Sequence, residues 1–414
     1  MRIVLTLIVA FFSISSNILA QSDFKTLDEK TYDYYLKGDY KNLKKTADTL
    51  LSQGIDYYFL RTRLGITAFN KGRYAESTED FIKALEFNSY DTISTRYIYY
   101  NYLFSGRRND AFLFSKSISP EQKTALMVSE EKKINNNIFA GATFTSFNQE
   151  TAISTSLYRE SLESAYSLYA GIEAHFGSMY TGTFAFTSFT KTGILNSSEY
   201  QSGTGFTFTQ AQIYGKLSAA IFPGWEVSLF AASAIYTTTQ STNKLIKENN
   251  LGAGIAKNWW RIRTGAEFSV SNFSNSRQYR EDAYITWLPQ GNLNFYLTAG
   301  GMFQYDMNWG SSYQLNQEAG YRITDNLWSE TGIIMGNSFL YARNQGYTIN
   351  NSFLIPSLTV YNNIIVPLKK IRHTLSPYFA RYQNYSWNIS SYTRTNHATI
   401  NSFGAAIKIN FNQR

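Results

Sequence analysis

Three histidines, His175, His373 and His397, are the side chains best suited to acid–base chemistry, and the chain has no cysteine. His397 follows Ser390 and Ser391 closely, and a Ser–His pair would suit a lipid hydrolase. However, no G-x-S-x-G elbow, H-E-x-x-H helix or phosphate-cradling G-x-x-x-x-G-K loop accompanies these residues. No cluster of metal ligands stands out, and thiolate chemistry is excluded. We therefore expect no catalytic residues, no metal and no cofactor.

A second set of reactive side chains is charged and lies within stretches that alternate with period two. From Trp260 to Val270, apolar residues alternate with charged or small ones, as in a β-strand with two different faces. A mid-membrane Arg or Lys facing lipid costs about 2–4 kcal/mol, so the charged face should point into the lumen of a barrel. The residues expected to line this lumen are Glu173, Lys216, Glu226, Arg261, Arg263, Glu267, Glu318, Arg322, Glu330 and Lys408.

Two interpretations of these inward charges stay open. In the first, mixed-sign charges line a pore that is narrowed by side chains and loops, and a solute passes through it. In the second, the charges neutralise one another and nothing passes. A barrel of about fourteen strands falls between the filled eight-stranded barrels and the open channels of sixteen to eighteen strands.

The same alternation recurs from about residue 137 to residue 414 and predicts an all-β antiparallel transmembrane barrel. Charged residues make up only 16% of the chain and aromatic residues 17%, which favours a membrane barrel over a large soluble all-β protein. No later apolar run approaches the roughly 20 residues of a membrane helix. The long outer loops, from which about fourteen strands with both ends in the periplasm are predicted, are 149–163, 192–201, 239–248, 273–279, 307–311, 339–351 and 387–396.

The first 20 residues are typical of a secretory signal peptide. Arg2 supplies the positive charge, Ile3 to Phe12 form the apolar core, and Ala20 ends a plausible cleavage zone. We therefore expect an exported protein, with 1–20 removed before folding.

Residues 24–133 have a helical spacing of apolar residues and an internal repeat. Gly38, Gly72 and Gly106 are 34 residues apart, and Lys37-Gly38-Asp39-Tyr40 is echoed by Lys71-Gly72-Arg73-Tyr74. This period is that of tetratricopeptide repeats, which are stacked pairs of antiparallel helices. The middle unit carries the packing residues of that family at Leu64, Gly65, Gly72, Tyr74, Phe81 and Ala84.

Such repeats resemble peptide-binding solenoids, in which the first helix of each pair lines a concave groove. This resemblance assigns a partner-binding groove to Tyr32, Tyr35, Phe59, Ile66, Phe69, Tyr100 and Leu103. The alternative interpretation is that most of these side chains form the core between helices.

The order of signal peptide, three repeats and C-terminal barrel resembles that of exopolysaccharide export porins, surface-lipoprotein assembly modulators and YaiO-type outer-membrane proteins. The resemblance implies a Gram-negative outer-membrane channel for export or assembly, whose periplasmic repeats dock a protein or polymer cargo. A non-conducting anchor for a periplasmic complex is the alternative, and an enzyme at the rim or in the lumen is a third. The net charge of +8 suits contact with anionic surfaces such as lipid headgroups or acidic polymers, whereas no basic run indicates nucleic-acid binding.

Overall fold

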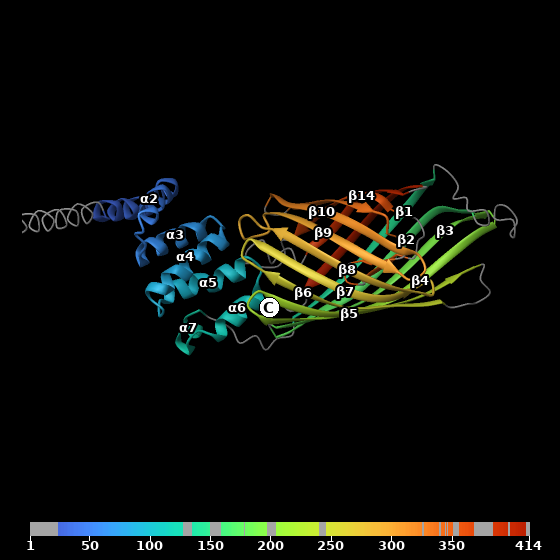
Figure 1. Cartoon of the computed structure of the whole chain (residues 1–414), viewed down its shortest axis with the longest axis horizontal. Helices are drawn as coiled ribbons and strands as arrows, with labels where there is room; N and C mark the ends of the chain where they lie inside the picture. The colour runs from blue at the N-terminus through green and yellow to red at the C-terminus, as the bar shows by residue number, and fades with distance from the viewer. Residues whose placement is uncertain are drawn as a thin grey trace, which may run out of the picture. The chain divides into compact units, whose positions relative to one another are not determined.

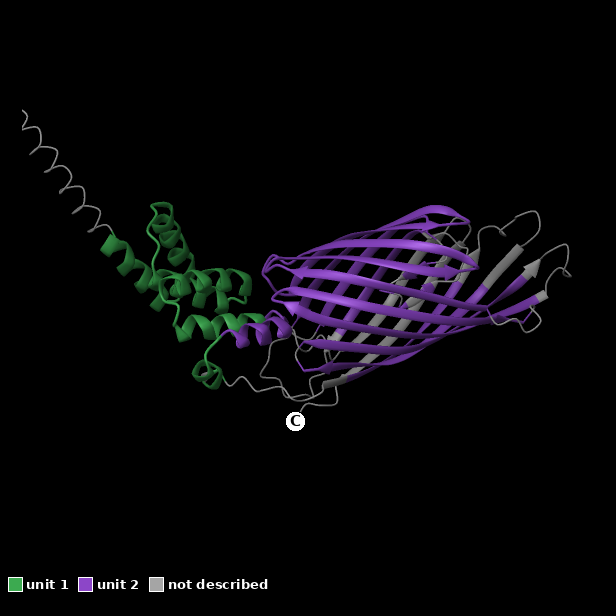
Figure 2. Ribbon diagram, turned by 60° about the horizontal axis from the view of Figure 1, so that its bottom comes forward, with its two compact units in different colours: residues 1–103, 118–127 green, residues 104–117, 128–414 purple. Residues whose placement is uncertain are grey.

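In the computed structural model, two compact units are distinguished, 1–103 with 118–127 and 104–117 with 128–414 (Figure 2). The structure describes residues 24–126, 135–149, 159–177, 179–196, 204–239, 246–324, 327–338, 341–343, 345, 347–350, 356–367, 384–395 and 398–410. The expected signal peptide, 1–20, lies outside the described residues. The division into units differs from the expected boundary near residue 133, because residues 104–117 group with the barrel.

The first unit is built from helices. Residues 24–36 are helical, and they are followed by α2 (Tyr40–Ser52), α3 (Tyr58–Asn70), α4 (Tyr74–Phe87), α5 (Thr92–Phe104) and α7 (Pro120–Ala125). Side-chain caps begin several of these helices, since the first backbone N–H groups of a helix lack partners within it. Asp39 accepts a hydrogen bond from the backbone of Asn42, and Asp91 accepts one from Ser94 at 2.8 Å.

The glycines that are 34 residues apart adopt the same backbone conformation. Gly38, Gly72 and Gly106 have φ angles of +68°, +70° and +77°, which glycine adopts without a steric penalty. Gly72 lies in the short turn that joins α3 to α4, as the repeat pattern predicts.

The packing between α3 and α4 explains a fourth glycine. A Cβ atom added at Gly65 would lie 2.8 Å from the ring of Phe81, which is fully buried and stacks on Tyr97. A larger residue at position 65 would therefore push α3 and α4 apart.

The second unit contains α6 (Arg108–Lys116) and a closed antiparallel barrel (Figure 1). Neighbours around the barrel follow the order β1-β16-β15-β14-β11-β10-β9-β8-β7-β6-β5-β4-β3-β2, so the last strand pairs with the first. The strands are β1 (Asn135–Gln149), β2 (Arg159–Phe176), β3 (Tyr180–Asn196), β4 (Thr204–Phe222), β5 (Trp225–Thr238), β6 (Ile246–Asn258), β7 (Ile262–Phe273), β8 (Ser276–Trp287), β9 (Phe295–Asp306), β10 (Gly310–Thr324), β11 (Leu327–Gly336), β14 (Pro356–Pro367), β15 (Asn384–Thr395) and β16 (Ala398–Asn410).

Exposure alternates along the strands as the sequence pattern predicts. Large apolar side chains such as Leu229 and Leu251 are 63% and 65% exposed, while Phe230, next to Leu229 on β5, is buried. The outer surface of the barrel is therefore mostly apolar, and the residues that alternate with these along each strand face its interior.

Several expected loops prove to be parts of strands. Ser274 and Asn275, both with positive φ, form a tight turn between β7 and β8 where a loop over 273–279 was expected. The expected loop 387–396 was also wrong, because most of it belongs to β15. In both places the strands carry many polar residues, which hide the alternation of apolar side chains.

Candidate functional site

A short hairpin between β11 and β14 fills part of the barrel interior. β12 (Tyr341–Arg343) and β13 (Thr348–Asn350) pair with each other in a sheet of their own, separate from the barrel sheet. The sequence predicts this segment as a polar outer loop. Instead, the ring of Tyr347 lies 6.3, 6.0 and 5.4 Å from the rings of Phe139, Tyr169 and Tyr214, on the inner faces of β1, β2 and β4. The hairpin therefore folds into the lumen and reaches strands far from its own attachment points.

Two glutamines of β4 bind the backbone of the hairpin. Gln212 donates to the carbonyl oxygen of Tyr347 at 2.9 Å and accepts from the N–H of Ile349 at 3.4 Å. Gln210 donates to the carbonyl oxygen of Ile349 at 3.4 Å. Both glutamines are almost fully buried, so these bonds satisfy amide groups that have little access to water.

A fourth hydrogen bond joins the hairpin to β7. The side-chain amide of Gln345 donates to the Glu267 carboxylate at 2.5 Å. Gln345 has a positive φ of 60°, which marks it as part of the turn between β12 and β13. The tip of the hairpin is thus bonded to one of the predicted lumen residues.

Apolar packing completes the attachment of the hairpin. Ala342 and Ile349 belong to a buried cluster whose other members come from the barrel wall, namely Ala185, Tyr214, Phe230, Ala232, Ala234 and Phe273. Burying one large aliphatic side chain stabilises by about 1.5–3 kcal/mol. Part of the interior beside β3, β4 and β5 is therefore apolar, whereas the sequence predicts a polar lumen.

Predicted lumen charges gather on β4, β5 and β7. Glu226 and Arg263 approach to 3.6 Å, and Lys216 lies within electrostatic range of Glu226, Glu267, Arg263 and Glu173. These residues share the inward parity, and side chains of both signs lie close together there.

Other predicted carboxylates have hydroxyl or amide partners. Tyr361 donates to Glu318 at 2.7 Å, Tyr296 donates to Glu330, and Asn137 donates to Glu173 at 2.9 Å. Pairing of the luminal carboxylates with Arg and Lys, as expected from the sequence, therefore describes only some of these carboxylates. Tyrosine on the inner face satisfies a carboxylate without adding a second charge.

The three remaining predicted lumen residues differ in position. Arg322 faces inward on β10, where it donates to Asn294 at 3.3 Å and lies over the ring of Trp328. Arg261 is exposed on the bend between β6 and β7, not within a strand, because β7 begins only at Ile262. Lys408 lies on β16 opposite Phe139, and its side chain is outside the described part.

Sequence reasoning missed several interior residues. Gln210 and Gln212 carry no charge, so a pattern of inward charges does not mark them, although both face inward and are buried. Arg280 and Asp282 form a bidentate pair on the inner face of β8, with both contacts at 2.6 Å. The alternation rule could have found this pair, but residues 273–279 were assigned to a loop, which displaced the start of β8.

Of the three histidines, His175 is the one that lies among the residues the structure describes. His175 contacts the Thr181 hydroxyl at 3.1 Å and the Glu173 carboxylate at 3.3 Å. His373 and His397 lie outside the described residues, and so do the side chains of Ser390 and Ser391. Among the residues that the structure describes, no three acidic or histidine side chains gather as a metal site would require.

The residues assigned to a groove in the helical unit divide into two groups. Tyr32 and Phe59 are 49% and 62% exposed, and Arg63 lies over the ring of Tyr32. Phe69 instead packs edge-on against Tyr74 and Tyr97 between helices. The other four, all half-buried, are Tyr35, Ile66, Tyr100 and Leu103.

Within the described residues, no helix has the length and apolar character needed to cross a bilayer. No family model matches the chain, and no curated protein sequence matches it.

Solved structures do resemble the chain. The toluene transporter TbuX of Ralstonia pickettii has a TM-score of 0.47 at 6% identity, covering 69% of this chain and 93% of that one. The toluene transporter TodX of Pseudomonas putida has a TM-score of 0.43 at 7% identity, with 69% and 93% covered. The translocator domain of the autotransporter NalP from Neisseria meningitidis has a TM-score of 0.34 at 10% identity, with 75% and 99% covered.

Proposed function

We propose that the chain is an outer-membrane channel for export or assembly whose lumen is closed by the 341–350 hairpin and opens when the hairpin withdraws. The observation that carries this proposal is the hairpin itself, folded into the barrel and bonded to β4 and β7. Its polar contacts are made by three side-chain amides, which would exchange these hydrogen bonds for bonds to water in an open state.

The apolar outer face supports the location in a membrane. A closed sheet leaves no unpaired edge, and hydrocarbon tolerates only such sheets or helices. The cyclic strand order is consistent with about fourteen strands, a size whose lumen needs an additional segment to be closed.

For the helical unit we propose a tetratricopeptide solenoid in the periplasm that docks a protein or polymer cargo. The 34-residue spacing of three glycines with positive φ supports the repeats. Exposed Tyr32 and Phe59 supply the aromatic surface that such a groove would offer.

A non-conducting anchor is the second candidate, and one observation favours it. The hairpin shares a buried apolar cluster with the barrel wall, as a permanent filling of the lumen would. This candidate keeps the docking role of the helices and removes the pore.

Conductance in planar bilayers separates the two candidates. The full chain is compared with a variant in which a short Gly-Ser linker replaces 341–350. A channel predicts rare openings in the full chain and a large steady conductance in the variant. The channel would be refuted if neither the full chain nor the variant conducts, provided that both are shown to be inserted in the bilayer and to be heat-modifiable on gels.

Deleting residues 24–126 tests the docking role independently. The expected result is an unchanged pore together with loss of cargo capture. Unchanged export by the deleted form would refute docking while leaving the channel intact.

A further inference from the structure

The outer face of the barrel carries a carboxylate on β8 whose nearest outward neighbours on β7 and β9 are aromatic. Glu281 lies on β8 with the parity of Tyr279, Ala283 and Ile285, and it is exposed. Within the described part of the chain, no hydrogen bond or ion pair engages its carboxylate. Ionisable residues facing the membrane are rare, and they commonly mark sites of function.

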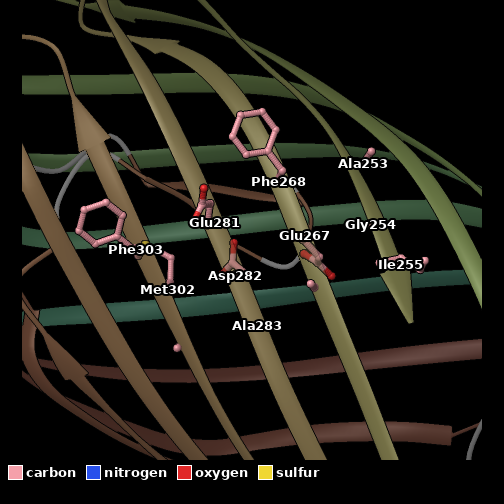
Figure 3. A pocket seen from close by; sticks show the side chains of 12 residues that line it. Ala253, Gly254, Ile255, Glu267, Phe268, Glu281, Asp282, Ala283, Met302 and Phe303 are labelled. Atoms are coloured by element: carbon pink, nitrogen blue, oxygen red, sulfur yellow. The ribbon is translucent and has the colours of Figure 1, made fainter. Parts of the chain in front are cut away.

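The register fixes the neighbours of Glu281. It pairs with Phe268 of β7 on one side and with Phe303 of β9 on the other, and Figure 3 shows it between these two rings. Outward-facing residues that pair across β7, β8 and β9 form rows on the barrel surface. The next such row, toward the turn at Ser274 and Asn275, contains Val270, Tyr279 and Tyr305. Glu281 therefore lies one row inside an aromatic row, at a depth where a headgroup meets its chains.

A hollow adjoins the Glu281 carboxylate on the side away from Tyr279 and Tyr305. Ala266, Ala283 and Gly301 follow one another across β7, β8 and β9, so three adjacent outward positions carry almost no side chain. They belong to a hollow of about 730 Å³ that Phe268, Glu281 and Phe303 also line. This volume falls within the range of small-molecule sites, about 300–1,000 Å³.

We propose that this hollow binds an amphiphile with a protonated amine headgroup, its alkyl chain lying over Ala266, Ala283 and Gly301 and its ammonium against Glu281. The site rests on the membrane location proposed above, and the side chains that would hold the amphiphile face outward. A cation offsets the energetic penalty of a carboxylate among apolar groups, and the two phenyl faces add cation–π attraction.

Other occupants fit the charge less well. An anionic lipid would place a phosphate against the carboxylate. A second copy related by a two-fold axis would oppose two Glu281 side chains across a medium of low dielectric. A neutral alkyl chain would fill the hollow and leave the carboxylate without a partner.

The test uses the full chain in neutral maltoside micelles, with dodecylammonium as the probe and dodecanol as the uncharged probe of equal chain length. Native mass spectrometry measures the occupancy of each. The wild type should retain one dodecylammonium at least tenfold more tightly than dodecanol. Glu281→Gln should reduce amine binding to the level of dodecanol, and Ala283→Leu should abolish binding of both.

A matched control is Ala299→Leu, which adds the same bulk at an outward position outside the hollow and should bind as the wild type does. Heat-modifiable migration on gels verifies that each variant folds. Equal amine binding by the wild type and Glu281→Gln would overturn the proposal, as would equal binding of amine and alcohol by the wild type. A dimer, or a co-purified protein, that Glu281→Gln alone removes would assign the hollow to that partner instead. The readout does not depend on conductance, so a closed barrel would leave this result interpretable.

Discussion

Gln345 and Glu267 form a contact on which hairpin position should depend. A hydrogen bond to a charged group stabilises by about 1.5–3 kcal/mol when water is excluded. In a hydrated lumen the same bond stabilises by less, because water competes for both groups. Gln345→Ala removes the donor that holds the hairpin tip to β7. We expect the open probability in single-channel recordings to rise roughly 5- to 30-fold, which corresponds to about 1–2 kcal/mol.

Gln314→Ala is the matched control for this change. Gln314 faces inward on β10, and its side-chain nitrogen has no bond to the described residues. An equal rise in both variants would show that any loss of a luminal amide opens the pore.

Gly65 should be intolerant of even one added carbon. In Gly65→Ala the new Cβ would lie 2.8 Å from the Phe81 ring, and overpacking of this kind destabilises by about 1–3 kcal/mol. Hydrogen exchange of the full chain should then show faster exchange in α3 and α4 and none of this change in the barrel. Unaltered exchange in these helices would contradict the packing described.

Asp80 makes the stability of the helical unit depend on pH. Burial raises the pKa of Asp80 from 3.8 to about 6, although Arg61 lies 2.8 Å away and opposes the shift. Between these values the folded form binds more protons than the unfolded form, so the free energy of unfolding should increase as pH falls from 6 to 4. The size is at most about 3 kcal/mol.

Asp80→Asn isolates this contribution. Hydrogen exchange of α4 at a series of pH values in both proteins provides the difference. The gain in protection at low pH should be present in the wild type and absent from Asp80→Asn. A wild-type helix that loses protection relative to the variant as pH falls would mean that the ion pair outweighs burial.

At the level of elements, the sequence predicts most of the barrel because strand faces differ in polarity. The alternation of polarity is lost where both faces of a strand are polar, and residues 276–279 are therefore predicted as part of a loop although they begin β8. The position of the hairpin inside the barrel is not predicted from the sequence for another reason. Its contacts with Gln210 and Gln212 join residues more than 130 positions apart, and no local period records them. Helix boundaries near Gly38 and Gly72 were predictable because a positive φ selects glycine.

The attachment of α6 to the barrel turns is a second feature that no local sequence pattern predicts. Asp110 accepts from the backbone N–H of Gly224 at 2.5 Å and pairs with Arg107 at 2.6 Å. Arg107 in turn donates to the carbonyl oxygen of Asn258 and lies over the ring of Trp260. Two hairpin turns of the barrel are thus bound by one buried ion pair.

Asp110→Ala should release α6 locally. It leaves Gly224 without its acceptor and Arg107 without its carboxylate, and breaking a buried pair costs about 3–5 kcal/mol. Backbone amides of 108–116 should exchange at least tenfold faster in the full chain, while amides of the barrel strands keep their protection. Glu121→Ala, on exposed α7, is the control, and equal effects of the two changes would refute the attachment.

For the whole molecule, the closed sheet and the in-folded hairpin together explain why charges, glutamines and tyrosines occupy the inner face. The barrel excludes lipid from these groups, and the hairpin satisfies several of them. A channel of this construction needs only a displacement of about ten residues to change from closed to open, with the wall unaltered.

The most direct test locks the hairpin in place. Because the chain has no cysteine, Glu267→Cys with Gln345→Cys introduces one reactive pair, which a short cleavable bis-thiol reagent can bridge. The prediction is that bridging abolishes openings in planar bilayers, that reduction restores them, and that neither single-cysteine variant responds. Openings that continue at the same rate with the bridge formed would contradict a gating hairpin inside the barrel.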